Sequence, residues 1–282
     1  MGAWFADFLM KNGYRVAISD KNSRAARALA RRKGFTFIES QEAAMRSAQI
    51  IVLATPTQVT KSILEQTPLS SSSEILVVEI SSVKATLIGV LEELHKRGID
   101  VLSIHPMFGP GIRRLKGNVI LTASVPAENA LARKLLSDFR RHGASVIRSD
   151  YDEHEKLLSA LLTLPHFLNI AMVNTLRHAG LSVNRLREVA GTTFRLQLLV
   201  AEAIFQEDLS NEASILIDSK RSLEILERFT RKSSAALHII KKRNRSGMIQ
   251  SLQAGREFLR KDVLFRTAYH HFNAAVDASN FQ

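Results

Sequence analysis

The chain has 282 residues, of which 45% are hydrophobic and 23% charged, and it contains no cysteine. This length allows one large domain or two ordinary domains with real cores, and the composition is that of a soluble globular protein. The lack of cysteine excludes disulfide bonds, iron–sulfur clusters and thiolate zinc sites. No uninterrupted apolar run approaches the roughly 18–20 residues of a membrane helix, and the N-terminus lacks a signal-peptide pattern. We therefore expect a cytoplasmic protein that does not bind a membrane.

The formal net charge of +12 favours anionic ligands, whether a dinucleotide, a dicarboxylate or a nucleic acid. Most basic residues are dispersed through predicted helices, and the densest run is KKRNR at 241–245. Aromatic side chains that would stack on bases do not interleave with this run. We interpret it as a solvated helix end and expect no nucleic-acid partner.

Short β-rich apolar runs alternate with helical patterns over residues 1–150, which predicts a parallel sheet with crossover helices. The predicted strands are 15–19, 35–38, 50–54, 75–80, 101–104, 119–121 and 145–147. The predicted helices are 4–12, 23–32, one opened by Ser40, 59–65, one capped by Ser81-Ser82 and running to 97, and 127–142. The polar run 70–73 is a predicted loop. The fold class of this part is therefore α/β.

Strand-like runs disappear after residue 150, and long helical periodicities replace them at 155–178, 209–231, 234–243 and 246–278. The spacing of Leu216, Leu223, Leu226 and Phe229 predicts a helix with one wide buried face. We expect two domains, 1–150 and 151–282, that meet at a packed junction without a linker. Because helices of this length need more partner surface than one chain offers, we also expect a homodimer.

One stretch, SIHPMFGP at 103–110, places a histidine where it could do chemistry. The predicted strand delivers His105 to a loop held stiff by Pro106 and Pro110. An imidazole in such a position can act as an acid or base near neutral pH. From these residues alone, a structural histidine beside a turn is the favoured interpretation.

Three motifs together resemble the prephenate/arogenate dehydrogenase family: the HPMFGP loop, Ser82-Val83-Lys84 and Leu164-Pro165-His166-Phe167. The resemblance extends over nearly the whole chain, and HPMFGP is its most specific part. It implies an oxidoreductase that uses NAD for the oxidative decarboxylation of prephenate or arogenate in tyrosine biosynthesis. It also implies a Rossmann-like NAD(P)-binding domain followed by an all-α dimerisation and substrate domain.

The start of the sequence, MGAWF, looks like the end of the family's glycine-rich cofactor segment, without the first strand and the first two glycines. Gly2 would be the last glycine, which lets the helix and the strand pack closely. The other two glycines supply the tight turn and the close approach to the pyrophosphate. We therefore expect the sequence as it stands to bind a dinucleotide poorly.

Two further segments resemble cofactor-binding positions. Asp20 ends a predicted strand about 20 residues after the glycine, where an acidic side chain binds the ribose hydroxyls of NAD. It could instead be an ordinary strand-end or cap residue. Lys21 and Arg24 keep NADP open, because they could meet a 2′-phosphate. Thr55-Pro56 ends another predicted strand. In the family, the backbone at this position runs beneath the cofactor.

The resemblance assigns catalytic roles to His105 and Ser82. The imidazole of His105 would accept the proton of the substrate hydroxyl while hydride leaves the same carbon. The hydroxyl of Ser82 would lie near the nicotinamide and the substrate hydroxyl, although a serine there could also cap a helix. No metal is needed, and the sequence contains no ligand cluster with metal spacing.

The helical part carries the implied substrate-binding residues. Arg195, within the segment GTTFRL, could hold a carboxylate by a bidentate pair, or could be a packing arginine. His166 is implied to line the substrate cleft, whereas His154 is expected to be a hydrogen-bonding residue at the start of the helix. The family has a second arginine eight residues after the first, and this chain has Ala203 there.

Two alternatives remain open at this stage. The substrate could be another small anionic hydroxy acid or cyclic carboxylate, which the alanine at 203 favours. The chain could also be a non-catalytic dimeric relative, which would fit the absent glycines.

Overall fold

The computed structural model describes residues 1–66, 75–126 and 129–279, in two compact units, Met1–Leu158 and Ser159–Gln282. The predicted loop at 70–73 and the predicted start of a helix at 127 lie outside the described residues. Each unit is described here by itself.

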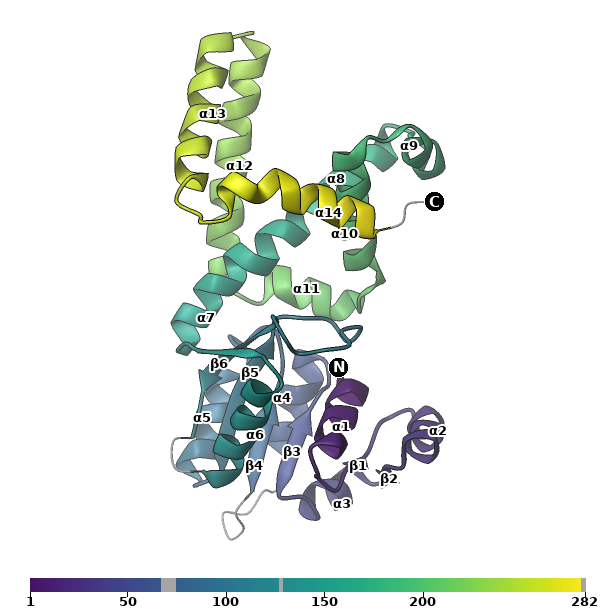
Figure 1. Cartoon of the computed structure of the whole chain (residues 1–282). Coiled ribbons are helices and arrows are strands. Elements are labelled where there is room, and N and C mark those ends of the chain that lie inside the picture. The colour runs from purple at the N-terminus through teal and green to yellow at the C-terminus, as the bar shows by residue number, and fades with distance from the viewer. Residues whose placement is uncertain (67–74, 127–128, 280–282) are drawn as a thin grey trace. The chain divides into compact units, whose positions relative to one another are not determined.

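The first unit is an α/β domain (Figure 1). Its strands are β1 Ala17–Ile18, β2 Thr36–Phe37, β3 Ile50–Leu53, β4 Leu76–Glu79, β5 Asp100–Pro106, β6 Val119–Ser124 and β7 Ser145–Arg148. Its helices are α1 Gly2–Lys11, α2 Ser23–Lys33, α3 Gln41–Arg46, α4 Thr57–Gln66, α5 Ile88–Lys96, α6 Ala130–Arg141 and α7 Tyr151–Leu158. Strands β1 and β2 form a parallel pair, and a second sheet has the order β3-β4-β5-β6-β7.

The central strands of the five-stranded sheet are apolar on both faces because helices cover both. On β4, Leu76 and Val78 point into a cluster with α1 and α6, whereas Val77 points into a second cluster with α3, α4 and α5. All three side chains are fully buried. This arrangement explains why β4 reads as a continuous apolar run and why the sequence predicted a buried strand here.

Local signals set several helix ends. Asn22 accepts a hydrogen bond from the backbone N–H of Ala25 and caps α2, which ends at Gly34 with a φ of +79°. Ser40 caps α3 by accepting from the N–H of Ala43, as predicted. These contacts satisfy backbone groups that a helix end leaves without partners.

Three predictions for this unit are wrong in detail. Helix α5 does not begin after Ser81-Ser82 but at Ile88, because residues 81–87 follow an irregular path tied to buried carboxylates. His105 lies inside β5, paired with Leu121 of β6, and not in the loop that follows. The strands do not form one parallel sheet: β5 and β6 are antiparallel, and no described strand joins β1–β2 to β3.

The second unit is helical, and its described residues contain no strand. It comprises η1 Ser159–Thr163, α8 Leu164–His178, α9 Val183–Val189, α10 Thr192–Gln206, α11 Leu209–Ile217, α12 Lys220–Lys241, α13 Arg245–Leu259, η2 Phe265–Thr267 and α14 Ala268–Ala278. Helix α8 packs against α10, α11 and α12, and α12 contacts α13 in a long hairpin (Figure 1).

The long helix predicted at 209–231 is in fact two helices, α11 and α12, and α12 runs on through the separately predicted helix at 234–243. Asp218 ends α11, and the buried Ser219 precedes α12. Leu216 therefore lies on a different helix from Leu223, which is 61% exposed. The predicted single buried face is wrong, because the break changes the helical phase.

One helix in the described part of the chain, Tyr151–His178, is long and apolar enough to cross a membrane by length and composition alone. The sequence criterion of an uninterrupted run missed it, because polar residues such as His166 and Asn169 interrupt the run. A π-helical turn, η1, lies within this helix. Helices of this kind also occur in the cores and interfaces of soluble proteins.

Candidate active site

A buried ion pair lies at the end of β4. The Nζ of Lys84 is 2.6 Å from Oε1 of Glu79, and both side chains are fully buried. Lys84 also donates to the carbonyl oxygen of Ile104 at 2.7 Å. Glu79 accepts further hydrogen bonds from the hydroxyl of Ser103 and the N–H of Ser81. These contacts tie the irregular segment 81–87 to the strand that carries His105.

His105 is almost completely buried, with 4% of its surface exposed. Its Nδ1 lies 3.2 Å from Nε2 of His154, whose side chain is fully buried on α7. The Nε2 of His105 has no hydrogen-bond partner among the described residues. The imidazole is therefore held through one nitrogen, and the other is left for a ligand.

Burial lowers the pKa of His105 well below its ordinary value, and the charge of Lys84 and the neighbouring His154 lower it further. Burial also lowers the pKa of Lys84, against the raising effect of Glu79. Because Glu79 is 2.6 Å away, we treat Lys84 as the charged member of an ion pair. A neutral imidazole with a free nitrogen can accept a proton at neutral pH.

Glu155 extends this cluster on α7. Its Oε1 accepts a hydrogen bond from the N–H of Lys84 at 3.0 Å and lies 3.6 Å from Nδ1 of His154. His154 is a buried, hydrogen-bonding residue near the start of α7, as expected, and its partner is His105. Ser82 is half-buried and lies in the sequence between Ser81 and Lys84, whose backbone N–H groups bond to Glu79 and Glu155.

The residues predicted to bind a cofactor lie at helix starts and at carboxyl ends of strands. Gly2 begins α1, and a Cβ built on it would lie 3.4 Å from Cβ of Ala54, just after β3. Asp20 is exposed after β1, and its Oδ1 accepts from the N–H of Asn22 at 2.8 Å. The hydroxyl of Thr55 is 2.8 Å from that of Thr60, and Pro56 precedes α4.

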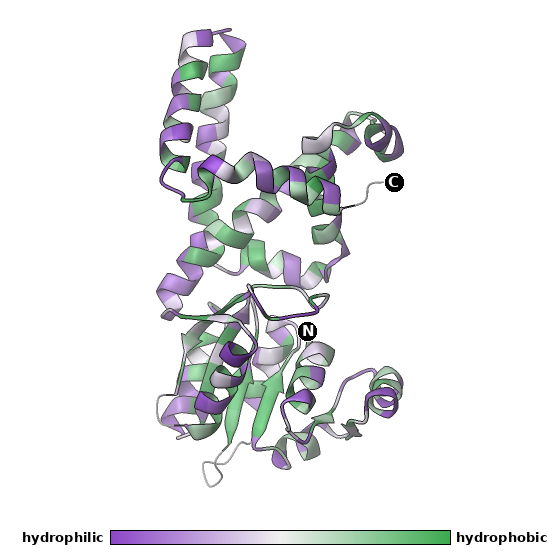
Figure 2. Cartoon of the chain, in the orientation of Figure 1, coloured by the Kyte–Doolittle hydropathy of each residue, from purple (hydrophilic) through white to green (hydrophobic). Residues whose placement is uncertain are grey.

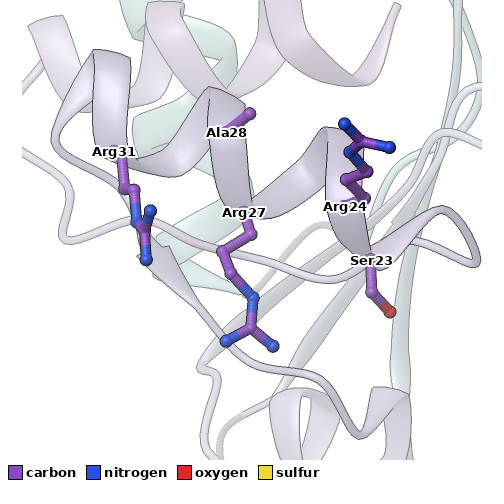
Figure 3. Close-up of a pocket in the computed structure, with 5 residues that line it drawn as sticks. All are labelled: Ser23, Arg24, Arg27, Ala28 and Arg31. Carbon is purple, nitrogen blue, oxygen red and sulfur yellow. The ribbon is translucent and has the colours of Figure 1, made fainter.

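A shallow basic pocket lies on α2, soon after Asp20. Figure 3 shows Ser23, Arg24, Arg27, Ala28 and Arg31 lining it. Arg27 is held by the ring of Phe37, at 4.8 Å from the ring centroid, and by Glu39, at 3.7 Å. Arg24 lies four residues after Asp20 and has no ion-pair partner among the described residues. Its positive charge is therefore not neutralised by a neighbouring carboxylate in the described part of the chain.

In the helical unit, the predicted substrate residues lie on α8 and α10, which contact each other. Nδ1 of His166 is 2.5 Å from Oε2 of Glu212 on α11. Arg195 is half-buried on α10 and has no ion-pair partner within the described chain. Ala203 is exposed on the same helix, about two turns further on.

The two sequence models of prephenate dehydrogenase domains match most of this chain. The nucleotide-binding domain matches residues 5–148, and the dimerization domain matches residues 150–254. The chain belongs to the prephenate dehydrogenase family. The predicted family and fold class, a Rossmann-like domain followed by an all-α domain, are thereby confirmed.

Curated relatives agree with this family. The probable arogenate/prephenate dehydrogenase of Methanocaldococcus jannaschii is 25% identical over 255 residues, covering 90% of this chain and 57% of that protein. The T-protein of Haemophilus influenzae is 22% identical over 261 residues, covering 92% and 64%. The chain thus spans about three fifths of the length of these relatives.

Solved structures in the prephenate dehydrogenase family share the fold. The prephenate dehydrogenase of Aquifex aeolicus, in complex with hydroxyphenyl propionate and NAD+, has a TM-score of 0.73 at 18% identity, with 93% of this chain and 95% of that chain covered. The arogenate dehydrogenase of Synechocystis has a TM-score of 0.65 at 17% identity, with 92% and 95% covered.

Sequence reasoning missed Glu79 and Glu155 and gave no role to Lys84. A signal for the first was present: Glu79 is the one acidic residue in an otherwise apolar run, five residues before Lys84. No comparable signal marked the contact between His105 and His154, which lie 49 residues apart.

Proposed function

We propose that this chain is a prephenate dehydrogenase-like enzyme that catalyses the NAD-linked oxidative decarboxylation of prephenate or arogenate, a step of tyrosine biosynthesis. The observation that carries the proposal is the buried, uncharged His105, anchored through Nδ1 with Nε2 free, in a chain of this family. A cytoplasmic location would suit such an enzyme.

The residues present fit the binding of a dinucleotide. Gly2 lies close enough to Ala54 to keep α1 packed against the end of β3, and α1 has no side-chain cap at its N-terminus. Uncapped N–H groups at a helix N-terminus favour a phosphate. The exposed carboxylate of Asp20 suits ribose hydroxyls, which favours NAD over NADP.

The proposed chemistry needs one base. When bound, NAD would supply the acceptor for the hydride that leaves the ring carbon bearing the substrate hydroxyl. Nε2 of His105 accepts the proton of that hydroxyl, so that the C–O bond becomes a carbonyl. Loss of CO2 then leaves the electron pair of the broken C–C bond in the ring, the carbonyl oxygen takes back a proton from His105, and the product is a phenol. Ser82 is proposed to donate to the substrate hydroxyl and to fix its direction.

We propose that the substrate's carboxylate binds Arg195. This arginine is half-buried and forms no ion pair with the residues that the structure describes, whereas Arg187 on α9 is held by Glu202 at 2.5 Å. His166 is proposed as a second substrate-binding residue, with Glu212 fixing its ring. A small anionic substrate is consistent with these charges.

A homodimer through the helical unit is the proposed assembly. The second family match is a dimerization domain, and the last helices leave large apolar side chains exposed. Figure 2 shows hydrophobic residues along α12, α13 and α14. Examples are Leu237, Ile240, Ile249, Leu252, Phe258 and Leu259. Exposed apolar surface of this extent indicates an interface.

Ala203 favours a second candidate substrate, a different small cyclic carboxylate, because the family's second arginine is absent there. The test is the formation of NADH, followed by absorbance, with purified chain, NAD and either prephenate or arogenate. Turnover of one of these supports the main proposal. Binding of NAD without turnover of either would favour the second candidate.

A further inference from the structure

The nitrogen atoms of His105 and His154 define a directed hydrogen bond. Nδ1 of His105 and Nε2 of His154 are 3.2 Å apart, and both rings are buried among helices and strands of the first unit. One of the two nitrogens must carry the hydrogen and the other must accept it. The position of one proton therefore decides which nitrogen of His105 is basic.

We propose that His154 is a positioning residue that holds His105 in the tautomer with hydrogen on Nδ1, and that Glu155 holds His154 in the matching tautomer. This inference rests on the proposed function, because it assigns the proton acceptor of that reaction to Nε2 of His105. In this proposal neither His154 nor Glu155 contacts the substrate.

The two possible tautomer pairs differ in whether Nε2 of His105 carries a hydrogen or a free lone pair. If His154 donates through Nε2, His105 carries its hydrogen on Nε2 and cannot accept a proton there. If His105 donates through Nδ1, its Nε2 has a free lone pair, and His154 carries its hydrogen on Nδ1. Only the second pair supplies a base to a ligand.

Glu155 selects the second pair. Nδ1 of His154 is buried without a hydrogen-bond partner, and Oε1 of Glu155 lies 3.6 Å from it. A hydrogen on this nitrogen points a positive edge toward the carboxylate, whereas a lone pair there would face negative charge. The same oxygen accepts the N–H of Lys84, which fixes the carboxylate in place.

Charges from the other packed elements act on His105 as well. Lys84 from segment 81–87 opposes a positive imidazole, and Glu79 from β4 compensates that lysine. Tyr151 of α7 stays neutral because burial raises its pKa. The carboxylate of Glu155 is thus placed to share, through His154, the charge that forms when His105 takes a proton.

The test combines a spectroscopic and a kinetic measurement on the full chain. Nitrogen-15 NMR of the histidine side chains at pH 8 should show His105 with hydrogen on Nδ1. His154→Phe removes the acceptor but keeps an aromatic ring, and should move His105 toward hydrogen on Nε2. It should also lower kcat by roughly 10²–10³-fold, within the usual range of a general base. His154→Gln, whose side-chain oxygen can accept the same hydrogen bond, should recover part of the original tautomer population of His105 and part of kcat.

His95→Phe, an exposed histidine on α5, is the matched control and should change neither readout. Hydrogen on Nε2 of His105 in the unaltered chain overturns the inference, and so does a His154→Phe variant with the original tautomer and kcat. If the Phe variant fails to fold, the unaltered chain and the Gln variant still decide. Absence of turnover in the unaltered chain would contradict the proposed function, while the NMR result would still test the tautomer.

Discussion

Glu79 and Lys84 form an ion pair in the interior of the α/β unit, with 2.6 Å between Oε1 and Nζ and no exposed surface on either side chain. Four residues separate them in the sequence, and one of these is Ser82. The pair therefore shapes the chain on one side of the candidate active site.

Removing one charge of this pair should be costly. Glu79→Gln leaves Lys84 buried without a counter-ion, and we expect a loss of about 3–5 kcal/mol in the free energy of unfolding. Chemical denaturation monitored by circular dichroism measures it. The double variant Glu79→Gln, Lys84→Met should be more stable than the single Glu79→Gln variant. Equal stability of single variant and unaltered chain would mean that the pair is not charged.

The lowered pKa of His105 predicts how stability depends on pH. Unfolding returns the imidazole to an ordinary pKa of about 6.5, so below that pH the unfolded chain binds a proton that the folded chain does not. This contribution to stability is complete above about pH 6.5 and is lost as the pH falls toward the folded pKa. His105→Asn cannot titrate, so its melting temperature should fall less between pH 8 and pH 5. Parallel curves for the two proteins would contradict the assignment.

Asp20 should decide between NAD and NADP. Its carboxylate would lie near a 2′-phosphate, and two unit charges about 4 Å apart in water interact by about 1 kcal/mol. A doubly charged phosphate therefore costs about 2 kcal/mol, which predicts a preference for NAD of roughly thirtyfold. Asp20→Asn keeps the oxygen that accepts from Asn22 but removes the charge. The ratio of the two dissociation constants, from calorimetry, should fall toward one. An unchanged ratio, with melting temperature unaltered, would remove Asp20 from the cofactor site.

Ala203 is exposed on α10, so an arginine fits there without loss of packing. If the substrate is prephenate, Ala203→Arg should lower its KM by roughly tenfold or more, since hydrogen bonds to charged groups contribute about 1.5–3 kcal/mol. Ala203→Gln is the uncharged control. A KM that does not change in the arginine variant would favour the other small anionic substrates.

The sequence predicted the fold class and most elements because β4 is buried on both faces, and β3 and β5 are largely buried, which leaves mainly apolar runs in the sequence. It located His105 and Ser82 through local motifs. It could not locate the contact of His105 with His154, because that contact depends on how β5 and α7 pack, and nothing in either segment encodes it. It also mistook 81–97 for one helix, since a serine pair normally caps a helix, whereas here the backbone N–H groups of Ser81 and Lys84 bond to buried carboxylates.

The central claim is that His105 accepts the proton of the substrate hydroxyl, and His105→Asn tests it most directly. The measurement is kcat with saturating NAD and substrate, taken together with the melting temperature of the same protein. We predict that kcat falls by roughly 10²–10⁴-fold while KM and the affinity for NAD change little, because the interaction belongs to the transition state. Near-normal kcat in the asparagine variant would contradict the claim and leave His105 as a structural residue of β5.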